Sequence, residues 1–279
     1  MDIIQTLARE LGESAQHVEN VVRLLDEGNT IPFIARYRKE ATGGIDDATL
    51  RDLDERLAYL RNLEARKDEV LRAIEEQGKL TADLRAKIDE AKVMQRVEDL
   101  YKPYRKKRAT RASKARDAGL EPLALLILAQ GRSAKDPLAL AAGLVNPEAG
   151  YPPPEDALQG AQDIVAEVIA DDAEHVACLR AAAKRNGALS VEAVDASEKT
   201  AYEAYYDFSE PLSRIPNHRI LAVNRGEKEK KLKVKVRTDA DAAISQLERR
   251  ILRGDGPFAA LLKAAIADGY KRLIAPSVE

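Results

Sequence analysis

The sequence is poor in cysteine, in aromatic side chains and in long apolar runs. It contains one Cys, which excludes a disulfide framework. No apolar stretch reaches the roughly 18 residues that a bilayer-spanning helix needs. The N-terminus, MDIIQTLARELGES, lacks the basic start and the apolar centre of a signal peptide. Together, these absences favour a cytoplasmic protein without a membrane partner.

The sequence also lacks the motifs that bind nucleotides or metals. It contains no GxxxxGK[ST] and no strand-led GxGxxG. His175 and Cys178 have ligand-like spacing on a helix, but two ligands do not close a metal site. The acidic groups at 46–47 and 171–174 are better explained as helix caps and first-turn charges. We therefore predict no enzymatic activity, no cofactor, no metal site and no small-molecule substrate.

What the sequence does contain is helical periodicity. Its residues are 45% hydrophobic, 33% charged and 4% aromatic, and the pattern predicts a mainly α fold, an elongated multi-helix array. The longest pattern, residues 46–77, repeats apolar residues every three or four positions, weakens near Lys67 and stops at Gly78. We expect one long strut helix there, capped by Asp46.

Shorter helices are expected on both sides of this strut. The helix that begins near Pro32 should bury Phe33, Ile34 and Tyr37. The run 120–130, LEPLALLILAQ, is apolar nearly all round and is expected in the core. Two last helices are predicted at 239–253 and 257–274.

Two stretches leave the local structure open. Residues 175–194 have the pattern of a helix, a turn at Asn186-Gly187 and a second helix, which fits a helix-turn-helix or any helical hairpin. Leu232, Val234 and Val236 alternate with Lys, as in a half-buried strand. Ile220–Val223 either pairs with this strand, giving at most a short β-hairpin near 220–237, or completes a helix.

These elements suggest three regions. Residues 1–148 form an N-terminal helical domain with the long helix 46–77 and a basic segment at 101–116. Residues 149–200 are helical and include the helix-turn-helix candidate, and 201–279 are helical with a short strand pair. The proline-containing loop NPEAGYPPPED, residues 146–156, is the preferred boundary.

The most informative stretch is the basic segment, where eight Lys or Arg and no Asp or Glu lie between Lys102 and Arg116. In a chain with a formal net charge of −2, this concentration of positive charge predicts an anionic partner. Lys and Arg that neutralise phosphates give salt-sensitive, sequence-independent affinity for nucleic acid. The candidate nucleic-acid-binding residues are Lys102, Arg105, Lys106, Lys107, Arg108, Arg111, Lys114 and Arg116.

An alternative remains, in which these charges contact an acidic face of another domain of the same protein.

The local structure of the basic segment can also be predicted. Pro103 is expected to end a helix and to make Lys102 extended. Arg105, Arg108 and Arg111 have helical spacing on one face, Thr110 is a candidate cap, and Gly119 is a candidate helix end. The second basic run, 225–237, is better explained as protection of a strand edge.

Three blocks of sequence resemble one family. EDLYKPYRKKRATRASKARDAGLEPLA at 98–124 is similar to the signature of the bacterial Tex proteins, transcription accessory factors distantly related to a eukaryotic elongation factor and histone chaperone. TIPFIARYRKEATGGIDD at 30–47 and YEAYYDFSEPLSRIPNHRILAVNRGE at 202–227 resemble further blocks of that family, in the same order. Lys102 replaces an apolar residue of the usual pattern, and Ala109 interrupts the basic run.

The resemblance implies a non-catalytic helical scaffold in a transcription accessory factor that binds RNA or DNA. It implies that such a protein continues into an RNase H-like (YqgF-type) domain, a helix-hairpin-helix region and an S1 domain, so that this chain would be an N-terminal fragment. Expected partners are nucleic acid through the parent protein, and RNA polymerase or other transcription machinery. The alternative is a protein–protein or interdomain module that never contacts nucleic acid.

Overall fold

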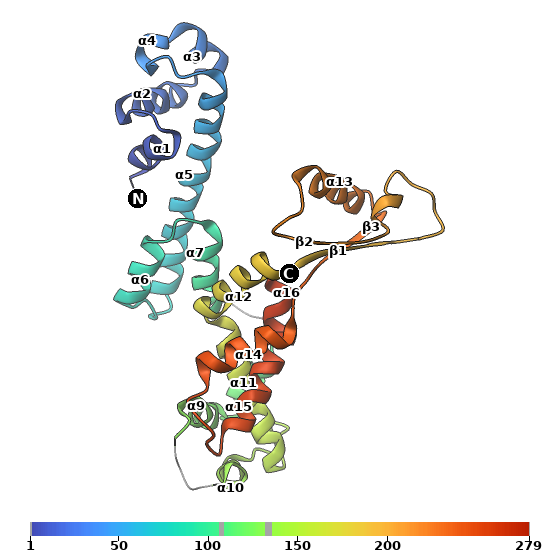
Figure 1. Ribbon diagram of the computed structural model, residues 1–279. Coiled ribbons are helices and arrows are strands. Elements are labelled where there is room, and N and C mark those ends of the chain that lie inside the picture. Colours follow the sequence, from blue (N-terminus) through green and yellow to red (C-terminus); the bar gives the residue numbers. More distant parts are fainter. Residues whose placement is uncertain (1, 106–108, 132–135, 279) are drawn as a thin grey trace. The chain divides into compact units, whose positions relative to one another are not determined.

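The computed structural model describes residues 2–105, 109–131 and 136–278, and it is mainly helical with one small antiparallel sheet (Figure 1). This confirms the mainly α prediction. The chain divides into two compact units, Met1–Tyr104 and Arg105–Glu279. Among the described helices, none combines the length and the apolarity that a bilayer span requires.

The first unit is built on the long helix α5, Asp47–Glu75, which has 29 residues and confirms the strut helix predicted at 46–77. Its buried face follows the expected spacing from Leu50 to Ile74. Asp46 caps α5 by accepting a hydrogen bond from the Thr49 amide at 2.7 Å. The other elements of this unit are α1 (Ile3–Leu11), α2 (Ala15–Asp26), α3 (Ile31–Tyr37), α4 (Lys39–Thr42), α6 (Ala82–Asp89), α7 (Met94–Tyr101) and the 3-10 turn η1 (Lys102–Tyr104).

Helices α1 to α4 lie along one end of α5 and helices α6 and α7 along the other (Figure 1). Arg56 of α5 donates two hydrogen bonds to Glu10 of α1, at 2.6 and 2.9 Å. Lys67 is only 2% exposed, and its ammonium group donates to Glu64 and to the carbonyl of Asp89, at 2.8 and 2.9 Å. The position where the apolar pattern weakens is therefore buried all the same.

The second unit is organised around α11, Pro154–Asp171, whose residues are buried on most sides. Gly160 of α11 allows the close approach of neighbours, since a Cβ there would lie 2.6 Å from Leu120 Cδ1. The elements packed against it are α8 (Arg111–Asp117), α9 (Glu121–Ala129), α10 (Pro137–Ala141) with the turn η2 (Ala142–Leu144), α12 (Ala173–Asn186), α15 (Ala259–Gly269) and the π-helical turn η4 (Tyr270–Ile274). Helices α14 (Ala240–Ile251) and α16 (Ala275–Val278) pack on α12 and η4.

Helix α9 departs from the expectation that residues 120–130 are buried all round. Leu123, Ala124 and Ile127 are buried, whereas Leu125 and Leu126 are 60% and 45% exposed. The amphipathic packing of a surface helix thus applies here even though nearly every side chain is apolar.

The proline-containing loop at 146–156 does not coincide with the division between the compact units. Asn146 and Tyr151 form an isolated antiparallel bridge, with amide–carbonyl distances of 2.9 Å in both directions. Tyr151 packs on the core around α11. The loop is therefore held within the second unit, and the division falls between Tyr104 and Arg105, inside the basic segment.

The sheet corrects the helix-turn-helix prediction. The expected second helix is the strand β1, Ala188–Ala193, which lies between β2 (Asp207–Pro211) and β3 (Leu232–Arg237) in an antiparallel sheet of order β2-β1-β3. Leu189 and Val191 point to one face and Ser190 and Glu192 to the other, so the alternation of a strand was present in the sequence. Its partners come later in the chain, beyond the reach of local periodicity.

Ile220–Val223, for which the sequence left a strand and a helix open, lies in helix α13, Asn217–Lys228. The predicted strand at 232–237 is confirmed, but its partner is β1 and no hairpin forms with 220–223. The short turn η3 (Glu203–Tyr205) precedes β2. One face of the sheet packs on α13 through a cluster that includes Val191, Val223 and Leu232.

Candidate nucleic-acid interface

Helix α8 carries the described C-terminal half of the basic segment. Thr110 caps it as predicted: its hydroxyl accepts from the Ser113 amide at 3.0 Å, and the Ser113 hydroxyl accepts from the Thr110 amide at 2.8 Å. Ala112 and Ala115 face the core. Gly119, at φ 84°, ends the helix as expected. This fixes the orientation of the basic side chains on α8.

Arg111 and Lys114 are exposed, three residues apart and so on the same face of α8. Within the described ranges, neither forms an ion pair with a carboxylate. Arg111 also borders a groove of about 340 Å³ together with Gln159, Gln162 and Asp268. These two cations are therefore available to an anion approaching from solvent.

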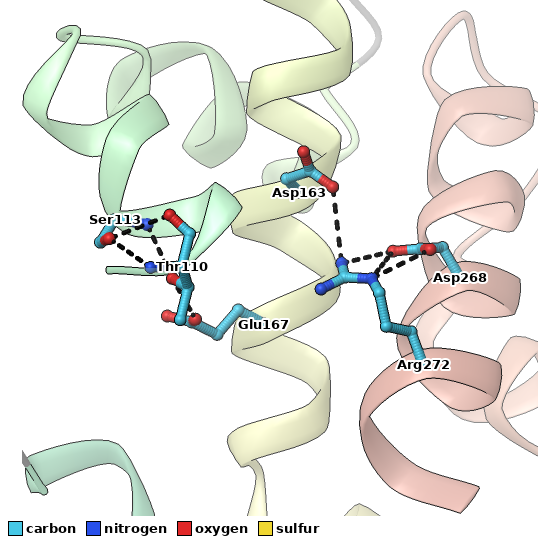
Figure 2. A network of polar contacts seen from close by, with 6 residues as sticks. All are labelled: Thr110, Ser113, Asp163, Glu167, Asp268 and Arg272. Carbon is cyan, nitrogen blue, oxygen red and sulfur yellow. Dashed lines mark hydrogen bonds and ion pairs between the residues drawn. The ribbon is translucent and has the colours of Figure 1, made fainter. Parts of the chain in front are cut away.

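Arg116 has a different environment. Its guanidinium donates to Glu167 of α11 at 2.7 Å. The hydroxyl of Thr110 donates to the other oxygen of Glu167 at 3.0 Å (Figure 2). Glu167 is buried. Arg116 thus holds α8 on α11 within the second unit, and its charge already has a carboxylate partner there.

A second buried carboxylate, Asp163, lies one turn before Glu167 on α11. Arg272 of η4 approaches it at 3.4 Å and is anchored to Asp268 at 2.6 Å (Figure 2). Burial raises the pKa of Asp163, although Arg272 and Arg111 pull it in the opposite direction. The hydrogen bond from Arg272 to Asp268 raises the pKa of the guanidinium. These two carboxylates fix α8 and η4 on either side of α11.

The N-terminal half of the segment lies elsewhere. Lys102 belongs to η1 of the first unit, and its backbone is helical (φ −49°, ψ −44°) because its amide still donates to the Glu98 carbonyl. The expectation of an extended Lys102 before Pro103 is therefore wrong, although α7 does end at Tyr101. Arg105 is an exposed residue in a bend, and residues 106–108 (Lys106, Lys107 and Arg108) lie outside the described residues.

The helical face expected for Arg105, Arg108 and Arg111 is not continuous, because Ala109 and Thr110 precede α8 without helical structure. Tyr101 lies beneath the Arg66 guanidinium, 5.5 Å from the ring centroid. Tyr104 contributes its carbonyl to a 3.0 Å hydrogen bond from Gln77. The predicted site residues are thus divided between the two units.

The second basic run is largely neutralised by neighbours. Arg225 pairs with Glu229 at 3.1 Å and Lys231 pairs with Glu198 at 2.5 Å. Arg237 pairs with Glu192 across the sheet at 3.1 Å. Lys233 and Lys235, on β3, have no carboxylate partner in the described part of the chain.

A cluster that the sequence analysis missed lies on α3 and the start of α4. Tyr37, expected in the core, is 61% exposed. The rings of Phe33 and Tyr37 are 5.3 Å apart between centroids. The Arg36 guanidinium lies 5.9 Å from the Tyr37 centroid, and that of Arg38 lies 5.2 Å from the Phe33 centroid. We call Phe33, Arg36, Tyr37, Arg38 and Lys39 the aromatic–basic cluster.

Arg36, Arg38 and Lys39 are exposed and form no ion pair with described carboxylates. Exposed cations interleaved with aromatic rings suit the phosphates and the bases of a single-stranded nucleic acid. The signal in the sequence was RYRK at 36–39, where the ring alternates with positive charge. Assigning Tyr37 to the buried stripe of the helix concealed it.

The side chains of His175 and Cys178 contact different neighbours. Cys178 Sγ accepts a hydrogen bond from Gln246 Nε2 at 2.9 Å, and His175 Nδ1 lies 3.4 Å from the Ile169 carbonyl. Over the described residues, no group of three or more His, Cys, Asp or Glu side chains is placed to hold a metal ion.

Comparison with known proteins gives one family match in each of the two compact units. Residues 1–75 match the Tex-like protein N-terminal domain, and residues 132–256 match the Tex central region-like family. These ranges contain two of the three blocks quoted above, and the basic segment lies between them. The order of the two matches is that of a Tex-type protein.

Curated relatives agree. The chain is 49% identical over 241 residues to "Protein tex" of Bordetella pertussis, covering 86% of this chain and 30% of that protein. It is 44% identical over 279 residues to "Transcriptional accessory protein Tex" of Neisseria gonorrhoeae, covering 98% and 35%. It is 29% identical over 292 residues to human "S1 RNA-binding domain-containing protein 1", covering 99% and 29%.

The chain belongs to the Tex family, of which it carries the N-terminal domain and the central region. It spans roughly a third of the length of the curated relatives it matches.

Proposed function

We propose that this chain is a non-catalytic helical scaffold of a cytoplasmic transcription accessory factor and that it contacts nucleic acid through two basic surfaces. One is the aromatic–basic cluster of the first unit. The other is the pair Arg111 and Lys114 on α8 of the second unit. The observation that carries the proposal is the exposed Tyr37 ring beside the Arg36 guanidinium, with Arg38 over the neighbouring Phe33 ring and neither arginine paired with a described carboxylate.

The names of the relatives support this proposal. One is named a transcriptional accessory protein and another an S1 RNA-binding domain-containing protein. By that analogy, RNA or DNA is the ligand and the transcription machinery, including RNA polymerase, is the protein partner. The cations supply salt-dependent affinity for phosphates, and Tyr37 offers a face on which an unpaired base stacks.

The test measures binding of a fluorescent single-stranded 20-mer to the chain by anisotropy at several salt concentrations. Arg36→Glu with Arg38→Glu should weaken binding more than about tenfold and should lower the slope of log K against log salt by roughly 1.4, for two lost contacts. Tyr37→Ala should cost about 1–3 kcal/mol, whereas Tyr37→Phe, which keeps the ring, should bind almost normally. Arg111→Glu with Lys114→Glu tests α8 separately.

The matched control is Lys79→Glu with Lys92→Glu, which makes the same change in charge at exposed positions outside the helices of the first unit. Affinity close to that of the unmodified chain is expected. If the α3 and α8 variants bind no more weakly than this control, the chain does not contact nucleic acid as proposed.

A different observation favours the alternative of a protein interaction module. Leu125 and Leu126 project from α9 into solvent, and adjacent exposed leucines are common in protein–protein contacts. In that case, nucleic-acid binding would be unaffected by the basic substitutions, and Leu125→Ser with Leu126→Ser would reduce association with the rest of the transcription machinery.

A further inference from the structure

Among the strands of the described residues, none pairs with the outer edge of β3. β3 is at one edge of the β2-β1-β3 sheet and its strand partner is β1. The Val194 amide donates to the Lys231 carbonyl at 2.9 Å, and the register places Ser190 opposite Lys235. In an antiparallel ladder, successive residues bond to alternate sides. Lys233, Lys235 and Arg237 therefore bond to β1.

It follows that the amide and carbonyl groups of Val234 and Val236 point away from the sheet. In the described ranges 2–105, 109–131 and 136–278, neither amide donates a backbone or side-chain hydrogen bond. Such an edge accepts an extended peptide as an additional strand, because the backbone hydrogen bonds are ready to form.

The two faces of this edge differ in chemistry. Val234 and Val236 are half-buried beside α13, adjoining the apolar cluster that contains Val191 and Val223. On the opposite face, Lys233 and Lys235 are exposed. An added strand would place every second side chain beside the valines and the others beside the lysines.

The lysines also determine which strand fits. A second copy of β3 would place lysine next to lysine, which is unfavourable between neighbouring strands. They lie on the open face, so an added strand would not bury their charge. An extended segment with acidic residues beside the lysines and apolar residues beside the valines satisfies both faces.

We propose that the free edge of β3 binds, as an added β-strand, an extended segment of a partner protein in which acidic and apolar residues alternate. The backbone of Val234 and Val236 supplies the hydrogen bonds, and Lys233 and Lys235 select the acidic partner. This surface is independent of the proposed nucleic-acid contacts.

The test uses the whole 279-residue chain and a fluorescein-labelled peptide in which four Glu alternate with four Val. Saturable binding is expected, at least roughly tenfold tighter than that of a peptide with four Lys alternating with four Val. A peptide of the same Glu and Val composition, arranged in two blocks, should also bind weakly because its side chains match neither face.

Three variants separate the contributions. Lys233→Glu with Lys235→Glu should weaken binding of the Glu peptide roughly tenfold or more and create affinity for the Lys peptide, a gain that an unfolded chain would not show. Val234→Pro removes an outward amide without breaking the β1 ladder and should weaken binding roughly three- to tenfold. The control Lys228→Glu with Lys263→Glu makes the same charge change at exposed positions and should bind normally.

Equal binding of all three peptides, or unchanged binding by Val234→Pro, would overturn strand addition. So would a result in which no peptide binds but a single-stranded oligonucleotide binds and depends on Lys233 and Lys235. That result would assign this face to nucleic acid.

Discussion

Asp163 and Glu167 lie one turn apart on the most buried helix of the second unit, yet their partners differ. Glu167 has Arg116 and Thr110 at hydrogen-bond distance, whereas among the described residues the one cation that reaches Asp163 is Arg272, at 3.4 Å. Burial therefore dominates at Asp163 and raises its pKa. A buried carboxylate with a weak partner reduces stability when it is ionised.

This predicts a stabilising substitution. Because the folded pKa of Asp163 is raised, the ionised group destabilises the chain above that pKa, and the cost disappears as the pH falls toward the unfolded value of about 3.9. Asp163→Asn should thus increase the free energy of unfolding at pH 7, with a smaller difference at pH 4.5. Arg272 keeps Asp268 as its partner. Urea unfolding followed by circular dichroism measures the difference.

The matched control is Asp156→Asn, an exposed carboxylate in the first turn of the same helix. It should lower stability by no more than about 1 kcal/mol. A loss of stability in Asp163→Asn that is the same at both pH values would show that the ion pair with Arg272 outweighs burial.

The basic segment and Tyr37 show how much of the candidate site could be predicted from the sequence. Eight basic residues in one segment indicated a shared anionic partner, but Arg116 turns inward to Glu167. Nothing local to Arg116 distinguishes it from Lys114; its partner lies 51 residues away and becomes a neighbour only when α8 packs on α11. Conversely, Tyr37 fits a helical apolar stripe, and only the packing of α3 leaves it exposed.

At the scale of elements, helix ends were predictable because caps are local. Asp46, Thr110 and Gly119 act as their chemistry indicated. Strand β1 was not predicted, because its stability comes from β2 and β3, which follow later in the sequence. Its alternation, Leu189 to Glu192, was too short to outweigh the helical pattern before it.

The buried Lys67 links helix α5 to the carbonyl of Asp89, and substitutions there test how much this contact stabilises the helix. Lys67→Ala removes the donor to the Asp89 carbonyl and leaves a cavity, so the free energy of unfolding should fall by roughly 2–4 kcal/mol. Lys67→Met keeps the aliphatic volume and should cost less. The neighbouring Asp68 is exposed, and Asp68→Ala should change stability by no more than about 0.5 kcal/mol. Equal costs for Ala and Met at position 67 would mean that packing of the stem contributes nothing.

At the scale of the whole molecule, the division at Tyr104 makes the first unit a candidate for independent folding. Its buried residues, among them Leu7, Val21 and Leu53, lie on helices that pack against one another within residues 1–104. A chain of this length is typical of a single domain. Residues 1–104 alone should therefore be helical and should unfold in one cooperative transition.

Two measurements on this shortened chain decide the point. Lys67→Ala should lower its unfolding free energy by the same roughly 2–4 kcal/mol as in the full chain, since all partners of Lys67 are retained. The effect of Tyr37→Ala on oligonucleotide binding should also persist, because the aromatic–basic cluster lies entirely within this unit. A non-cooperative transition, or loss of the Tyr37 effect with folding intact, would show that the first unit depends on the second.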